Sequence, residues 1–184
     1  GESTARSTVS IVLAGPPSQG SPPTITQSGK TVTIAWTPQT TNGAIITNYN
    51  VYLLDMVDST YKEFPALCNG LTALTANSVS PSCAIKMSSF TSTLSYPIGT
   101  AIRAQFTATN SKGTSPTSSP NTASIVAQSA PTIAVSGLSA TSTITTITLS
   151  WTALTTDANI GYSAITGYLI TNNIFGQDNY KFPF

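Results

Sequence analysis

Short runs of alternating apolar and polar residues dominate the chain and predict β-strands. Residues 31–36 read Thr-Val-Thr-Ile-Ala-Trp, and residues 46–53 read Ile-Thr-Asn-Tyr-Asn-Val-Tyr-Leu. Residues 82–87 alternate in the same way, and every second residue of 102–108 is apolar, as expected of antiparallel strands with one buried face. Apolar positions show no sustained helical period, so we expect helices to be absent or trivial.

The same phrases occur twice along the chain, which predicts tandem copies of one domain. Residues 33–37 (Thr-Ile-Ala-Trp-Thr) return at 148–152 as Thr-Leu-Ser-Trp-Thr, an offset of 115. Further repeated phrases are Pro23-Thr24-Ile25 with Pro131-Thr132-Ile133, residues 46–49 with residues 165–168, and Tyr61-Lys62 with Tyr180-Lys181. A period near 115 fits a β-sandwich domain of about 100 residues and a short linker.

These residues resemble the fibronectin type III family. The family pattern has a Pro-rich start, a Trp on the second strand, the phrase Ile-Thr-x-Tyr-x-Val, and Ala-x-Asn-x-x-Gly before Ser/Pro. Here those elements are Pro22-Pro23, Trp36, residues 46–51 and residues 108–116. The resemblance implies an all-β fold of tandem fibronectin type III, immunoglobulin-like sandwiches, one complete and two partial. Ile102 stands where the family has a corner Tyr, so that corner hydrogen bond is not expected.

The resemblance divides the chain into four segments. Residues 1–13 would be the last strand of a preceding domain, and 14–22 a Pro-rich linker, extended because consecutive Pro residues favour polyproline II. Residues 23–127 would form the complete domain, and 128–184 the first half (strands A, B, C and C′) of another. The expected core side chains are Trp36, Tyr49, Val51, Ile85, Ile102, Phe106, Trp151 and Tyr168.

A half-sandwich would expose an apolar face and unpaired edges, which isolated proteins avoid. Two arrangements would complete it. In the first, the chain is a window of a longer array with flanking domains. In the second, the strand at 7–13 adds to the half-domain of a neighbouring copy. We favour the window, because one strand would not replace all the missing ones. In either arrangement the contacts run head to tail, and head-to-tail contacts that do not close into a ring build a fibre.

Composition excludes several classes of function. The chain carries 7 Lys and Arg, 6 Asp and Glu, no His and a net charge of +1. Without a basic surface we expect no nucleic-acid partner, and no apolar run reaches the roughly 18 residues of a transmembrane helix. Without His, no Ser-His-Asp triad can be built, and Asp55 and Asp58 are interpreted as solvated turn acids. We therefore expect no enzyme activity, cofactor or metal site.

Cys68 and Cys83, 15 residues apart, are the only cysteines. In a β-rich chain of low charge the preferred interpretation is one disulfide, worth about 3 kcal/mol for a loop of that length. Two buried free thiols are the alternative, whereas a metal site would lack further ligands. The stretch Ser82-Cys83-x-Ile85-x-Met87 also resembles Cys-containing fibronectin type III repeats of large surface proteins of ciliates and other protists.

Hydroxyl residues make up about a third of the chain, with 32 Thr and 25 Ser. Thr favours strands, and hydroxyl groups keep a weakly charged surface hydrated. Proline-flanked runs are also typical of O-glycan acceptors. The candidate acceptors are Ser18, Ser21, Thr114, Thr117, Thr141 and Thr143. None of the 11 Asn residues begins an Asn-x-Ser/Thr sequon, so N-glycans are not expected.

The favoured function is that of a non-enzymatic, extracellular or cell-surface structural protein. Its repeats would build a fibre or filament through neighbouring copies of the chain, with glycans as further partners. The alternatives are an adhesion or receptor ectodomain that binds a protein or glycan, and an accessory module of a secreted enzyme.

Overall fold

The computed structural model describes residues 13–76, 78–122, 125–171 and 179–183. The chain divides into two compact units, which we describe separately. One unit comprises Gly1–Lys86 and Arg103–Ala123, and the other comprises Met87–Ile102 and Ser124–Phe184. The all-β prediction is confirmed, since strands predominate in the described chain and its three helices have four to seven residues.

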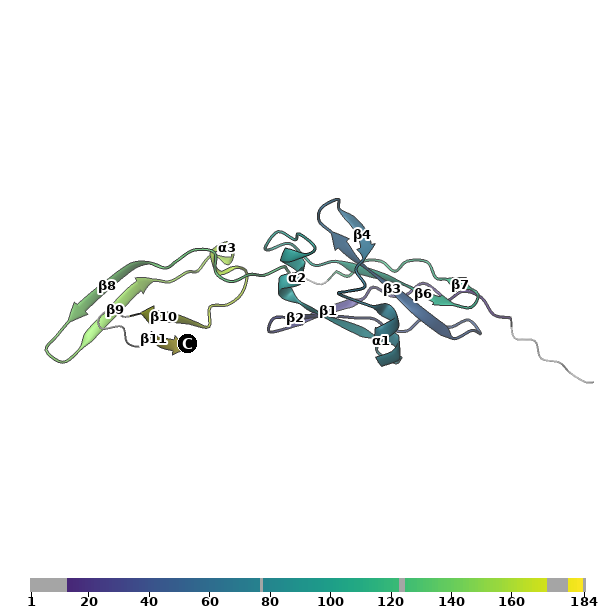
Figure 1. Ribbon diagram of the computed structural model, residues 1–184, viewed down its shortest axis with the longest axis horizontal. Helices are drawn as coiled ribbons and strands as arrows, with labels where there is room; N and C mark the ends of the chain where they lie inside the picture. The colour runs from purple at the N-terminus through teal and green to yellow at the C-terminus, as the bar shows by residue number, and fades with distance from the viewer. Residues whose placement is uncertain (1–12, 77, 123–124, 172–178, 184) are drawn as a thin grey trace, which may run out of the picture. The chain divides into compact units, whose positions relative to one another are not determined.

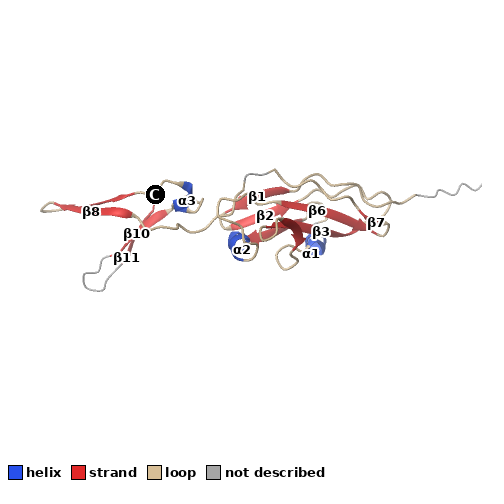
Figure 2. Ribbon diagram, turned by 90° about the horizontal axis from the view of Figure 1, so that it is seen from above, coloured by secondary structure: helices blue, strands red, loops and turns tan. Residues whose placement is uncertain are grey.

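The first unit contains two antiparallel sheets (Figures 1 and 2). One has the order β1-β2-β5, built from Thr24–Ser28, Thr31–Ala35 and Ser82–Lys86. The other has the order β4-β3-β6-β7, built from Thr60–Glu63, Ile46–Asp55, Ala104–Asn110 and Gly113–Thr114. Helix α1, Gly70–Ala76, lies between β4 and β5 in sequence and contacts β3.

Side chains from both sheets meet in one core, which makes the unit a β-sandwich. The alternation on β3 buries Tyr49 and Val51, and on β6 it buries Phe106. Trp36 follows β2, and its ring lies 5.4 Å from that of Tyr49 and 5.7 Å from that of Phe106. This aromatic cluster joins the sheets and fixes which face of β3 points inward.

Six of the predicted core residues are buried, with exposed fractions of 4% or less. They are Trp36, Tyr49, Val51, Ile85, Ile102 and Phe106. Trp151 and Tyr168 are only half-buried, although their rings are in contact at 5.3 Å.

The second unit contains α2 (Met87–Ser92), α3 (Asp157–Ile160) and two hairpins (Figure 1). Strand β8, Ser136–Ser142, pairs with β9, Ile147–Thr152, and β10, Gly167–Thr171, pairs with β11, Asn179–Pro183. The hairpins are the counterparts of β1–β2 and β3–β4 that the repeat predicts. The repeated Pro131-Thr132-Ile133 differs, because it lies in a bend before β8, whereas Thr24-Ile25 lies in β1.

The described part of the predicted linker is held against the first unit. The Gly15 amide donates to the Asn42 carbonyl at 2.9 Å, and the Asn42 side chain donates back to the Pro16 carbonyl at 2.7 Å. Asn110 donates to the Gly15 carbonyl at 2.8 Å. Most of the predicted strand 1–13 lies outside the described residues, and the division into four segments stays a prediction.

Candidate functional site

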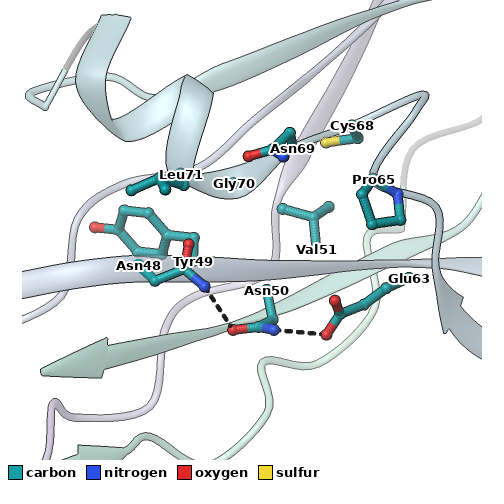
Figure 3. Close-up of a pocket in the computed structure, with 10 residues that line it drawn as sticks. All are labelled: Asn48, Tyr49, Asn50, Val51, Glu63, Pro65, Cys68, Asn69, Gly70 and Leu71. Atoms are coloured by element: carbon teal, nitrogen blue, oxygen red, sulfur yellow. Dashed lines mark hydrogen bonds between the residues drawn. The ribbon is translucent and has the colours of Figure 1, made fainter.

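A hollow of about 240 Å³ lies beside β3 in the first unit (Figure 3). It is lined by Asn48, Tyr49, Asn50, Val51, Glu63, Pro65, Cys68, Asn69, Gly70 and Leu71. Figure 3 shows the Asn48, Asn50 and Glu63 side chains on one face of β3, with Pro65 and the start of α1 on the other side. The hollow therefore sits at the edge of the strand, between a polar face and an overlying loop.

A chain of hydrogen bonds orders the polar side. The Asn48 amide nitrogen donates to Asn50 Oδ1 at 3.2 Å, and Asn50 Nδ2 donates to Glu63 Oε1 at 2.6 Å. Alternation on β3 places both Asn side chains on the outer face, and β4 brings Glu63 beside them. Both bonds point toward the carboxylate, so its charge fixes the orientation of the two amides.

The edge of β3 is unpaired at the hollow because β4 ends early. The β3–β4 register ends at Tyr52 and Glu63. The next carbonyl, that of Phe64, turns away and accepts from the amides of Leu67 and Cys68 at 2.8 and 2.9 Å. Pro65 then has no N–H to offer. At this edge, backbone N–H or C=O groups of β3 therefore have no partner on a neighbouring strand.

The register shows which groups these are. The Ala108 and Phe106 backbones bond to Ser115 and Ser118, away from β3. Their partners Tyr49 and Val51 therefore direct their own backbone groups away from β6, toward the hollow. Outside the strand ladders, no backbone group of the described chain accepts from the Val51 N–H, although Val51 is only 3% exposed.

Gly70 allows α1 to approach this edge closely. A Cβ at Gly70 would clash severely with the backbone carbonyl oxygen of Tyr49. Asn69 precedes the helix, and its Oδ1 accepts from the Thr72 amide at 3.0 Å, which satisfies one free donor of the first turn.

The disulfide holds this segment in place. Cys68 and Cys83 are bonded, with their Cα atoms 5.3 Å apart, so the residue before Asn69 is tied to β5. Both cysteines are buried. The disulfide interpretation therefore agrees with the structure, and the free-thiol and metal alternatives do not.

The interpretation as solvated turn acids holds for Asp58, which is exposed, but not for Asp55. Lys62 Nζ lies 2.8 Å from Asp55 Oδ2 and 2.5 Å from Asp58 Oδ2. Asp55 is buried, and its Oδ1 also accepts from the Val57 amide at 3.0 Å. The hydrogen bond from Lys62 lowers the pKa of both acids, that of Asp58 to about 2, and the same bonds raise the pKa of Lys62.

All six candidate O-glycan acceptors are exposed: Ser18, Ser21, Thr114, Thr117, Thr141 and Thr143. Two of them have hydroxyl partners, since Thr114 bonds Thr109 at 3.0 Å and Thr143 bonds Thr146 at 2.7 Å. The neighbouring Ser115 and Ser118 are buried and bond β6. The segment that contains Thr114 and Thr117 therefore holds exposed hydroxyl groups as well as buried ones that bond β6.

Within the described ranges, no three His, Cys, Asp or Glu side chains gather as metal ligands would. The same ranges hold no helix with the length and apolarity of a membrane span. The sequence did not indicate the hollow, because it depends on where the Phe64 carbonyl turns and on the contact between Gly70 and Tyr49.

Comparison with known proteins finds similarity in structure only. No protein-family model matches the chain, and no curated protein matches it in sequence. The crystal structure of chicken CNTN1 FN1-FN3 domains is similar at 19% identity and a TM-score of 0.44, over 92% of this chain and 52% of that one. The structure of titin kinase and its flanking domains is similar at 18% identity and a TM-score of 0.43, over 61% of this chain and 17% of that one.

Proposed function

We propose that the chain is a non-enzymatic structural protein of the extracellular space or cell surface, whose copies assemble head to tail into a fibre. The internal repeat, the buried disulfide and the very low charge support this proposal. Disulfides persist mainly in oxidising compartments outside the cytosol. The proposal also includes a relation to the Cys-containing surface repeats of protists, and O-linked glycans on the exposed hydroxyl groups.

One observation carries the assembly. Strands β8, β9 and β10 of the second unit expose large apolar side chains: Leu138 by 68%, Ile147 by 73% and Leu169 by 60%. Leu138 and Ile147 lie on the paired strands β8 and β9, and exposed apolar side chains of this size are typical of surfaces that another protein covers. A neighbouring copy of this chain, with apolar strands of the same pattern, is the partner that we propose.

The test compares two matched charge substitutions. Ile147 and Val57 are 73% and 75% exposed, in the second and first unit respectively. We expect Ile147→Lys to abolish filaments in negative-stain images and to leave monomers in light scattering, whereas Val57→Lys assembles like the parent chain. Parent chains that remain monomeric at every concentration, or equal assembly by both variants, would overturn the proposal.

O-glycosylation is tested separately by intact mass of the protein from its source. We expect excess mass in hexose-sized steps, mapped by fragmentation to exposed sites such as Thr117 and not to the buried Ser115 or Ser118. A mass equal to that of the bare chain would remove glycosylation from the proposal and leave assembly standing.

A further inference from the structure

We propose that the hollow beside β3 binds a single neutral sugar ring. The side chains of Asn48, Asn50 and Glu63 line this hollow and hydrogen-bond to one another, and these two bonds leave other donors and acceptors of the same side chains for a ligand. Sugar binding at this hollow is independent of whether copies of the chain assemble.

The hydrogen-bonding groups that remain free in the hollow include both donors and acceptors. The ordered chain from Asn48 to Glu63 uses one N–H of each amide, Oδ1 of Asn50 and Oε1 of Glu63. It leaves Asn48 Oδ1 and Glu63 Oε2 as acceptors, and the second N–H of Asn50 as a donor. Asn69 adds its amide N–H groups, because only its oxygen is used by Thr72. A sugar hydroxyl donates and accepts at once, so adjacent ring hydroxyls match this mixture.

The backbone adds one more donor. The N–H of Val51 points to the hollow at the unpaired edge of β3, and no backbone group of the described chain outside the strand ladders accepts from it. A buried N–H without a protein partner needs water or a ligand oxygen. A ring hydroxyl at this position would accept from the Val51 N–H.

The apolar part of the hollow suits the C–H face of a sugar. Pro65 and Leu71 border it from the loop and from α1 (Figure 3), and both are exposed, Leu71 by 51%. The volume of about 240 Å³ lies below the roughly 300–1,000 Å³ of sites for drug-sized ligands. The space therefore suits one ring.

Other ligands fit less well. An added peptide strand needs successive free backbone groups along an edge, but α1 begins against the Tyr49 carbonyl, so the edge is open mainly at Val51. A divalent metal would find one carboxylate, Glu63, among the lining side chains. A phosphate would find no Lys or Arg there.

The test is a titration followed by NMR. The ¹⁵N-labelled chain is titrated separately with D-glucose, D-galactose, D-mannose and N-acetyl-D-glucosamine. We expect at least one sugar to give saturable shifts of the side-chain amides of Asn48, Asn50 and Asn69 and of the Val51 backbone amide. The Kd should lie in the millimolar range, because one small ring makes few contacts.

Two variants and a control locate the site. Glu63→Ala removes the charged acceptor and should weaken binding about tenfold. Leu71→Trp, at an exposed position of α1, should fill the hollow and abolish the shifts. Asp157→Ala removes an exposed acid of the second unit and should leave the Kd unchanged.

The rest of each variant's spectrum reports whether it is folded. No saturable shift with any of the four sugars would overturn the proposal. Equal binding by the parent chain and both hollow variants would also overturn it. The proposal would also fail if N-acetyl-lysine methylamide, which mimics a protein side chain, shifted the amides at the hollow and none of the sugars did.

Discussion

Ser118 and Phe106 are joined by two hydrogen bonds that run in opposite directions. The Ser118 amide donates to the Phe106 carbonyl at 2.9 Å, and the Phe106 amide donates to Ser118 Oγ at 3.0 Å. Ser115 bonds Ala108 in the same way, at 2.8 and 3.0 Å, and Asn121 bonds Ala104 at 3.1 and 2.7 Å. Each step of three residues along 115–121 thus matches a step of two along β6, and side-chain oxygens replace the carbonyls of a regular ladder.

We expect Ser118→Ala to lower the free energy of unfolding by about 1–3 kcal/mol, because it leaves the buried Phe106 N–H without an acceptor. The measurement is urea unfolding followed by Trp36 fluorescence in a Trp151→Phe background. Ser119→Ala is the matched control, since Ser119 is exposed, and it should change stability by less than about 0.5 kcal/mol. Equal effects of the two variants would show that the Ser118 hydroxyl is not part of the ladder.

The disulfide should stabilise the first unit by closing a loop. We expect the double variant Cys68→Ala/Cys83→Ala to lose about 3 kcal/mol in the same assay, as the loop-closure entropy of a 15-residue separation predicts. Comparing the parent chain with and without a thiol reductant gives an independent measurement of the same quantity. Unchanged stability in both experiments would contradict this role.

The alternation of side chains could predict much of the fold, because a strand with one buried face leaves a period of two in the local sequence. It placed Tyr49, Val51 and Phe106 correctly on β3 and β6, and the spacing of Cys68 and Cys83 suggested their bond. The aromatic contacts among them follow once two sheets face each other.

The hollow and the serine ladder could not be predicted in this way. Ser115 and Ser118 stand in a proline-flanked run that also reads as a set of glycan acceptors, and only pairing with β6 separates them from Thr117. The approach of Gly70 to Tyr49 depends on a contact between residues 21 positions apart. Such tertiary contacts leave no periodic signal in the sequence.

Lys62 should control the titration of the β3–β4 turn. We expect a carboxyl NMR titration to give Asp58 a midpoint at about 2, and Lys62→Met to return it toward the ordinary value near 4. Because the pKa of each acid is lowered in the folded state, their stabilisation is present above pH 4 and is lost as the pH falls toward 2. Lys30→Met, at another exposed lysine, should leave the Asp58 midpoint unchanged. An unchanged midpoint in Lys62→Met would show that the ion pairs do not form in solution.

Tyr49 has a hydroxyl that the fold does not use. The residue is 2% exposed, burial raises its pKa, and no residue of the described chain forms a hydrogen bond with its oxygen. Burying a hydroxyl without a partner costs about 1–3 kcal/mol, so Tyr49→Phe should keep or raise the free energy of unfolding, by up to about 2 kcal/mol.

The control for Tyr49→Phe is Tyr168→Phe, because the Tyr168 oxygen accepts from the Leu154 amide at 3.3 Å. Removing that acceptor should lower stability by about 0.5–1.5 kcal/mol. Urea unfolding of the two variants, followed by Trp36 for the first and by Trp151 for the second, should give changes of opposite sign or a neutral result for Tyr49. A loss above 1 kcal/mol in Tyr49→Phe would mean that the hydroxyl has a partner in solution. The Tyr49 ring also contacts Trp36 and Phe106, and Phe preserves these contacts, so such a loss could not come from the aromatic cluster.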